Sequence, residues 1–467
     1  MAYYDVWKGG AWIEQLQELH RLYGTYLTTS PFYAMSNNPL TGSVVRVAPN
    51  QLHFSDPQAY ADIYSSKSTK DPDLYGAMSV SDSLFTQTDP REVLAQEGTI
   101  QSTVDTLIRQ LLKNHSPSQT PANLELAFRS TAFDIITAYC FAKSINAVSH
   151  PGFHHDVLVA MDGVLPAIPL LKHFRIVKDI ILSIPHWLAP ILIPSMKFIV
   201  DQISDVIDLV ETVMRDPDSD TGFFSHRTIF HSFLDGYGVN GENSSTTKRR
   251  SHPVTKQWLV DEGLICRFTG SDGTVSSACV IGCQYVLADR EVLGKLVKEL
   301  DDAWPDASVP AKYELLEKLP YLTGVVKESL RLSHRPISLS PRIVGTGGAT
   351  IAGHFVPEGI SVSMADSFVH LNPGIFIEPE RFKPERWLQS DSITLEKYLV
   401  AFGNLGPRSC IGINLAWCEL YLIMGNIFRR LELAPTMDVS SPYRVRDCFI
   451  PLYDDDLLHV VVTERLL

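Results

Sequence analysis

The chain has no excess of positive charge, no dense set of cysteines and no internal repeat. Its 467 residues carry a formal net charge of -13, which argues against nucleic acid as a partner. The seven cysteines are odd in number and scattered along the chain, so a reducing compartment fits better than a disulfide framework. Residues 1–10 lack an apolar core segment, and no signal peptide is expected.

A long uninterrupted apolar run is also missing. An apolar stretch without a formal charge covers residues 180–196, and Pro185, Pro190 and Pro194 interrupt it. Because it is too short to span a bilayer comfortably, we favour a buried or cleft-lining segment. A segment that dips into a membrane surface is the alternative.

What is present is an ordinary globular composition, with 45% hydrophobic and 20% charged residues. Apolar residues at helical spacing predict helices over residues 11–23, 98–113, 123–143, 257–288, 290–303 and 311–333, and over much of 155–215. Short strands are predicted within 43–54 and 342–364, and a terminal hairpin with its turn at 454–456. Residues 236–255 are predicted to form a flexible surface loop. The fold class is therefore mainly α with minor β sheets.

The most informative feature is Cys410, in the stretch AFGNLGPRSCIGINLAWCEL. We expect backbone N–H groups at the helix start to stabilise a thiolate and lower the pKa of this thiol. Gly406 lets a flat ligand approach the backbone, and Arg408 is placed to pair with a carboxylate on that ligand. This combination suits a haem iron held by cysteine thiolate. The alternative is a buried free cysteine before a core helix.

A second feature is a charged pair inside an apolar helix. Glu328 and Arg331 lie three residues apart in YLTGVVKESLRLSHRP, and Arg386 follows in FIEPERFKPERWL. The helix is apolar on most sides, so we expect one buried carboxylate to be shared by two guanidinium groups and to pin a loop near the cysteine. The alternative is an exposed pair that contributes little.

The third feature is TGSDGT at residues 269–274, a sequence of weak helix propensity within a long apolar helix. It indicates either a kink at a functional site or a plain loop between two helices, and the sequence leaves both open. Asp272 and Thr274 are candidates for proton transfer through water to bound dioxygen.

Four motifs, TGSDGT, KESLR, FKPERW and GPRSCIG, occur in the order and spacing of the cytochrome P-450 family. The resemblance covers essentially the whole chain, which we take as one haem domain over residues 1–467. KESLRLSH and CIGINLA look most like fungal members that tailor secondary metabolites, the trichodiene oxygenase group among them. The resemblance implies haem b as cofactor, an NADPH-dependent reductase as partner, and hydroxylation or epoxidation of an apolar metabolite.

The resemblance also assigns roles by position. It makes Cys410 the axial iron ligand, Arg408 a partner of a haem propionate, and Arg342 a second propionate candidate. The remaining carried-over residues are Glu328, Arg331 and Arg386 as a structural triad, and Asp272 as the helix acid near the dioxygen site. Residues 155–215 would cap the substrate pocket.

For localisation, the family expectation is the cytosolic face of the endoplasmic reticulum membrane. Tyr3 already matches the region that follows the usual N-terminal anchor. The chain as written is therefore expected to be cytoplasmic or peripheral, with a peripheral membrane contact.

Several departures from the family pattern accompany the resemblance. Gly273 occupies the position of a threonine that helps to protonate dioxygen. Gly403 occupies the position at which the family has a phenylalanine, and Phe402 lies one residue earlier. The loop before the cysteine thus carries one extra residue, for which Leu405 is the candidate, so Phe402 is displaced from its usual place beneath the haem. In residues 88–102, two segments that the family has on either side of a haem-facing helix follow each other directly, so that helix is expected to be absent. Residues 25–42 resemble an insertion.

These departures leave alternatives to the monooxygenase. One is a haem-thiolate isomerase or dehydratase that acts on an already oxygenated substrate and tolerates Gly273. The other is an inactive or degenerate family member without competent haem binding, or the product of a faulty gene prediction.

Overall fold

The structure is a computed structural model that describes residues 2–23, 43–64, 69–70, 90–117, 120–185, 188–192, 196–215, 226, 228–237, 254–271, 273–333, 339–389, 392–403, 409–439, 445–448, 450–453 and 458–465. The insertion predicted at residues 25–42 lies outside these ranges, as does most of the loop predicted at 236–255.

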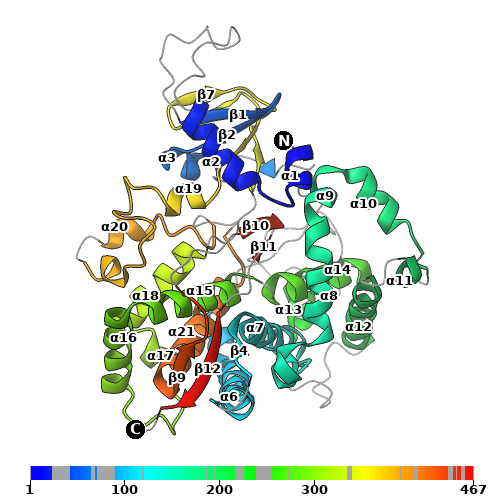
Figure 1. Cartoon of the computed structure of the whole chain (residues 1–467). Helices are drawn as coiled ribbons and strands as arrows, with labels where there is room; N and C mark the ends of the chain where they lie inside the picture. The colour runs from blue at the N-terminus through cyan, green and yellow to red at the C-terminus, as the bar shows by residue number, and fades with distance from the viewer. Residues whose placement is uncertain are drawn as a thin grey trace.

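A large helical part and a smaller part rich in strands make up the molecule (Figure 1). The described α-helices are α1 (Ala2–Trp7), α2 (Trp12–Tyr23), α3 (Gln58–Ile63), α5 (Pro90–Ala95), α6 (Glu97–Asn114), α7 (Leu124–Phe141), α8 (Asp156–Val164), α9 (Ile168–His173), α10 (Arg175–Leu182), α11 (Ala189–Leu192), α12 (Met196–Arg215), α13 (Ile229–Tyr237), α14 (Lys256–Ser271), α15 (Thr274–Ala288), α16 (Arg290–Ala303), α17 (Tyr313–Leu316), α18 (Pro320–Leu332), α19 (Ser367–His370), α20 (Ser392–Glu396) and α21 (Ile413–Arg430). Short 3₁₀ helices are η2 (Ala147–Ser149), η3 (Pro151–Phe153), η4 (Leu165–Ala167) and η5 (Pro384–Trp387).

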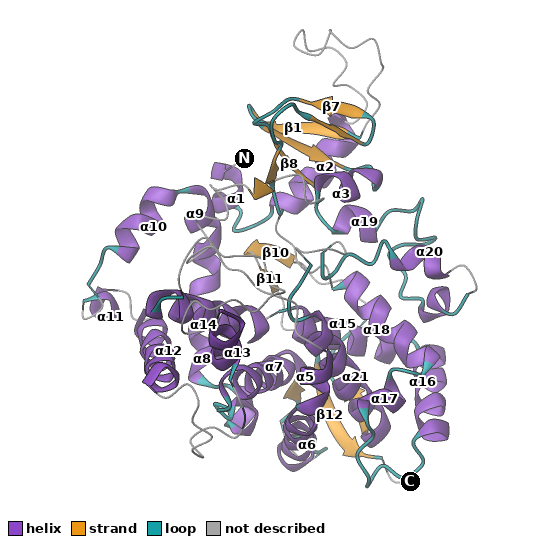
Figure 2. Ribbon diagram, turned by 180° about the vertical axis from the view of Figure 1, so that it is seen from behind, coloured by secondary structure: helices purple, strands orange, loops and turns teal. Residues whose placement is uncertain are grey.

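The strands form small sheets, seen from the other side in Figure 2. A five-stranded sheet has the order β1 (Val44–Ala48), β2 (Gln51–Phe54), β8 (Ser361–Ser363), β5 (Arg342–Ile343) and β3 (Thr69–Lys70). The other strand sets are β6 (Ala349–Ile351) with β7 (His354–Val356), β10 (Val445–Cys448) with β11 (Ile450–Tyr453), and β4 (Ala122–Asn123) with β12 (His459–Glu464) and β9 (Leu431–Pro435). Both views place the hairpin of β10 and β11 between the helical part and the strand-rich part.

The helical core is organised around α7, α15, α18 and α21. Helix α7 is buried on nearly all sides, as expected for a helix that is apolar all round. It begins at Asn123, whose side chain accepts a hydrogen bond from the backbone of Leu126 at 3.1 Å, a typical N-cap. Helix α15 packs against α7, α18 and α21. Its N-cap residue, Gly273, is therefore attached to a helix at the centre of the core.

The N-terminal helix α1 is tied to distant parts of the chain by buried charges. Lys172 of α9 lies 3.0 Å from the carboxylate of Asp447 in β10, and His173 lies 2.7 Å from that of Asp5 in α1. Both carboxylates are fully buried, so the charges have to remain paired. This cluster joins α1, α9 and β10.

The predicted loss of a helix between residues 88 and 102 can be followed in the structure. Within residues 90–117, all of which are described, α5 and α6 are separated by Gln96 alone. The two helices therefore follow each other directly, while the absence of the family's haem-facing helix stays a prediction.

The predicted terminal hairpin is wrong in its pairing. Strand β10 pairs antiparallel with β11, and residues 448 and 450 lie opposite each other. Strand β12 instead pairs antiparallel with β9 and with β4. The physical reason is burial, because this pairing places Val460 and Val462 in the main core.

Among the described residues, no helix combines the length and the apolar character needed to cross a bilayer.

Candidate functional site

Cys410 lies at the entry to helix α21, on a loop whose ends are joined by a backbone hydrogen bond. Its N–H donates to the carbonyl oxygen of Phe402 at 2.9 Å. The N–H of Gly403 donates to the carbonyl of Val400 at 2.8 Å, which closes a turn just before the loop. Gly412 is the N-cap residue of α21. The cysteine is therefore held from both sides, by the turn and by the helix.

The expectation of a lowered pKa for this thiol is wrong. Burial raises the pKa of Cys410, and the hydrogen bond from the N–H of Gly412 offsets only part of that effect. The side chain keeps accessible surface, yet protein atoms crowd around the sulfur and displace water that would stabilise the thiolate. A cation bound at the sulfur would reverse this balance, because a coordinating thiol is deprotonated by the metal.

Accessibility separates Cys410 from the other cysteines. All seven are described and free, and Cys410 alone is exposed; the buried ones are Cys140, Cys266, Cys279, Cys283, Cys418 and Cys448. Because the other six cysteines are buried, Cys410 is the cysteine that an external ligand can reach in this structure. The alternative of a buried free cysteine at this position is wrong.

The predicted charged set comes together around Glu328. Arg331 donates to this carboxylate through Nε at 2.7 Å and Nη2 at 2.9 Å, and Arg386 donates through Nε at 2.8 Å. The three side chains are 6% exposed or less. The alternative of an exposed pair is therefore wrong, because α18 turns this face toward η5 and the segment before it.

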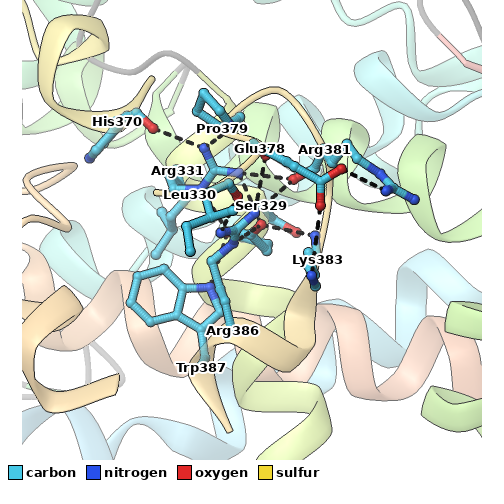
Figure 3. A network of polar contacts seen from close by, with 12 residues as sticks. Ser329, Leu330, Arg331, His370, Glu378, Pro379, Arg381, Lys383, Arg386 and Trp387 are labelled. Atoms are coloured by element: carbon cyan, nitrogen blue, oxygen red, sulfur yellow. Dashed lines mark hydrogen bonds and ion pairs between the residues drawn. The ribbon is translucent and has the colours of Figure 1, made fainter. Parts of the chain in front are cut away.

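Other members of this network were not singled out from the sequence. Trp387 donates its indole N–H to Glu328 at 3.1 Å, and the backbone N–H of Lys383 donates to it at 2.9 Å. Arg331 also donates to the carbonyl of His370 at 2.9 Å. Figure 3 shows these groups converging from α18, α19 and the 378–387 segment. Trp387 directly follows Arg386 in FKPERW, whereas no local pattern points to His370.

The long helix predicted over residues 257–288 is broken in two. Helix α14 ends at Ser271 and α15 begins at Thr274, with Gly273 as its N-cap residue. Thr274 is half-buried at this break, while Asp272 lies outside the described residues. A β-carbon built on Gly273 would lie 2.9 Å from the carbonyl oxygen of Thr269, so the present backbone does not accommodate a side chain at this position.

Of the two predicted propionate partners, Arg342 lies within the described residues and Arg408 does not. Arg342 is buried in β5, where it donates to the carbonyl of Ser340 at 3.0 Å and lies over the ring of Tyr64 at 5.0 Å. Arg408 and Gly406 lie outside the described residues, as does Leu405. Phe402 is buried and packs 5.9 Å from Trp417, measured between ring centroids.

Residues 83–447 match the sequence model of the cytochrome P-450 family. The chain belongs to the cytochrome P-450 family. Its relatives include the cytochrome P-450 monooxygenase flvC of Aspergillus flavus, 33% identical over 86% of this chain and 75% of the relative. Others are claJ of Penicillium crustosum, 30% identical over 84% of this chain and 91% of the relative, and TRI4 of Fusarium sporotrichioides, 27% identical over 92% and 80%.

Family membership makes the chain a haem-dependent monooxygenase, since cytochrome P-450 proteins bind haem b. They work with reductases as redox partners and act on hydrophobic substrates. The described residues fit such a cofactor. Cys410, the accessible cysteine, is of the residue type that can ligate a haem iron through its thiolate. Among the described residues, no group of three or more His, Cys, Asp or Glu is arranged to hold a metal ion.

Proposed function

We propose that this cytochrome P-450 hydroxylates or epoxidises an apolar small metabolite in a fungal secondary-metabolite pathway, with Cys410 as the protein ligand of the haem iron. The observation that carries the proposal is the placement of Cys410: the exposed cysteine, at the entry to α21, with its N–H bound to the carbonyl of Phe402. When bound there, haem supplies the activation of dioxygen that thiolate ligation favours.

The chain's own residues hold and orient the group in this proposal. Arg408 and Arg342 pair with the propionates, and Gly406 lets the porphyrin approach the backbone. Glu328 with its two arginines keeps the segment before the cysteine in place, because a shared buried carboxylate fixes both guanidinium groups.

Proton delivery is assigned to the break between α14 and α15. Asp272 and Thr274 flank Gly273, and the half-buried Thr274 stands at the first turn of α15. In this proposal they move protons through water toward the reacting oxygen.

Electrons come from an NADPH-dependent reductase in this proposal. The substrate lies under the segments of residues 155–215, and the enzyme works at the cytosolic face of the endoplasmic reticulum with a peripheral membrane contact. These assignments rest on the family. In this proposal residues 1–467 are one haem domain.

A second candidate function is supported by Gly273. An isomerase or dehydratase that uses haem-thiolate chemistry on an already oxygenated substrate needs no proton delivery to dioxygen, and it therefore tolerates a glycine where the family has threonine. Conversion of a peroxide substrate without reductase would favour this candidate over the monooxygenase.

The test is the carbon-monoxide difference spectrum of the reduced, purified protein. We expect the long-wavelength band of a thiolate-ligated haem in the native chain, its loss in Cys410→Ser, and its retention in Cys448→Ala, which removes a buried thiol. Folded native protein without this band would overturn the proposal and favour an inactive family member.

A further inference from the structure

We propose that His370 is a positioning residue that connects the Glu328 network to the turn that holds Cys410. This inference rests on the proposed role of Cys410 as the iron ligand. His370 is fully buried, so it touches neither substrate nor solvent and acts through its neighbours. It is the last residue of α19, a short helix that lies between the two parts of the site.

The first link joins His370 to the charged network. Arg331 donates from Nη1 to the carbonyl oxygen of His370 at 2.9 Å and to that of Pro379 at 2.5 Å. Figure 3 shows His370 at one edge of the network, with its carbonyl directed at Arg331. The guanidinium is itself held by Glu328, so the end of α19 is bound to a charge that cannot move without leaving its partner.

The second link uses the imidazole ring. Nε2 of His370 accepts a hydrogen bond from the backbone N–H of Val400 at 3.0 Å. A ring nitrogen accepts only when it carries no proton, so the ring is neutral with its proton on Nδ1. Val400 is itself buried, and a buried N–H that loses its acceptor is costly.

The third link runs from Val400 to the cysteine. The carbonyl of Val400 accepts from the N–H of Gly403 at 2.8 Å, and the carbonyl of Phe402 accepts from the N–H of Cys410 at 2.9 Å. His370 thus fixes the start of the turn, and the turn fixes the acceptor that holds the cysteine. The backbone carbonyl of His370 thus accepts from the charged network, while its side chain accepts from the turn that precedes the cysteine loop.

A matched control exists elsewhere in the fold. His53 in β2 is also fully buried, and its Nε2 accepts from the backbone N–H of Ala365 at 3.1 Å. Its ring hydrogen-bonds to that of His20 at 2.8 Å and packs 4.8 Å from the ring of Phe368 in α19, measured between centroids. His53 therefore contacts the beginning of α19, whereas His370 binds the turn at Val400. Replacing His53 therefore measures the cost of losing a buried imidazole acceptor in general.

The experiment compares His370→Phe, which removes the acceptor, with His370→Gln, whose side-chain oxygen can still accept from Val400. His370→Leu repeats the removal in a smaller volume, and His53→Phe and His53→Gln are the controls. Two readouts on the full-length, haem-free chain do not depend on cofactor: hydrogen exchange at the amide of Val400, and the alkylation rate of Cys410 by iodoacetamide. A third readout is the share of thiolate band in the carbon-monoxide spectrum of haem-loaded protein.

We expect His370→Phe and His370→Leu to speed exchange at Val400 roughly tenfold, the effect of one lost buried hydrogen bond on local opening. Alkylation of Cys410 should change several-fold, and part of the thiolate band should convert to the shorter-wavelength form. His370→Gln should restore all three toward the native values. His53→Phe should leave the Cys410 readouts unchanged even if it lowers the melting temperature.

Equal effects of His53→Phe and His370→Phe on Cys410 would overturn the inference, because they would reflect general destabilisation. Unchanged exchange at Val400 in both removal variants would overturn it as well. A native chain without a thiolate band would defeat the proposed function alone, since exchange and alkylation would still report on His370.

Discussion

Gly403 shows how one backbone conformation decides which side chain can precede the cysteine loop. Its φ is +78°, a left-handed conformation that glycine adopts freely and that strains a bulky residue. The family's phenylalanine would be strained at this position. Phe402, one residue earlier, is buried instead and gives its carbonyl to Cys410. The departure noted in the sequence is thus a requirement of this turn.

Asp366 is a second residue whose surroundings set its behaviour. It is 7% exposed, and burial raises the pKa of its carboxyl well above the ordinary value, with the hydrogen bond from Tyr60 offsetting part of this. Among the described residues, its Oδ2 has no hydrogen-bond partner. The folded form therefore keeps its proton to higher pH than the unfolded form, whose pKa is about 3.9.

The free energy of unfolding should accordingly fall as pH rises from the unfolded pKa toward the higher folded pKa. We expect Asp366→Asn to stabilise the protein by about 1 to 3 kcal/mol near neutral pH, the scale of an unsatisfied buried polar group. The gain should disappear toward about pH 4. Urea unfolding at several pH values measures it, with the exposed Asp302→Asn as control. A gain that does not vary with pH would contradict this account.

At the scale of elements, helix α18 is joined to η5 by one shared carboxylate. Glu328 on α18 receives Arg331 from its own helix and Arg386 from η5. Both cations lie near the ring of Phe376, Arg331 at 5.0 Å and Arg386 at 5.9 Å. The arginines also donate to backbone carbonyls between residues 370 and 381. These side-chain donors satisfy carbonyl groups in an irregular segment.

Glu328→Gln should therefore destabilise the protein strongly, by about 3 to 5 kcal/mol, because it leaves two buried cations without a counter-charge. The matched control is Glu378→Gln, which removes a carboxylate paired with Arg381 at the surface, where the two side chains are 45% and 72% exposed. The control should cost less than about 1 kcal/mol. Chemical denaturation measures both, and equal effects would mean that the buried carboxylate has no special role.

At the level of the whole molecule, the direct succession of α5 and α6 bears on which elements can surround a haem. The sequence resemblance places a haem-facing helix between these two segments, and here Gln96 alone separates them. Among the described elements, α21 and the Val400–Gly403 turn flank Cys410. The buried ionisable groups of α9 join the N-terminal helix α1 to strand β10 near the end of the chain.

Haem should accordingly stabilise the native chain through Cys410. A ligand present at about 100 times its dissociation constant adds about 2.7 kcal/mol, which should raise the melting temperature by several degrees. Cys410→Ser should reduce this shift while changing the haem-free melting temperature little, because the residue is exposed. Differential scanning calorimetry with and without haem measures both. An equal shift in the variant would show that haem binds elsewhere.

The family, most of the helices and the residues of the Glu328 set could be predicted from the amino-acid sequence, which also singled out Cys410 among the cysteines. These follow from local periodicity and from motifs within a few residues of one another, such as KESLR and FKPERW. The weak propensity of residues 269–274 likewise located the break between α14 and α15.

Properties that depend on contacts between residues far apart in the chain could not be predicted from the sequence. The raised pKa of Cys410 comes from desolvation by surrounding protein, which no helix-start pattern reveals. The pairing of β12 with β9 comes from burial in the main core, which outweighs the nearer turn. His370 joins Arg331 to Val400 across 39 residues on one side and 30 on the other, separations over which local pattern carries no information.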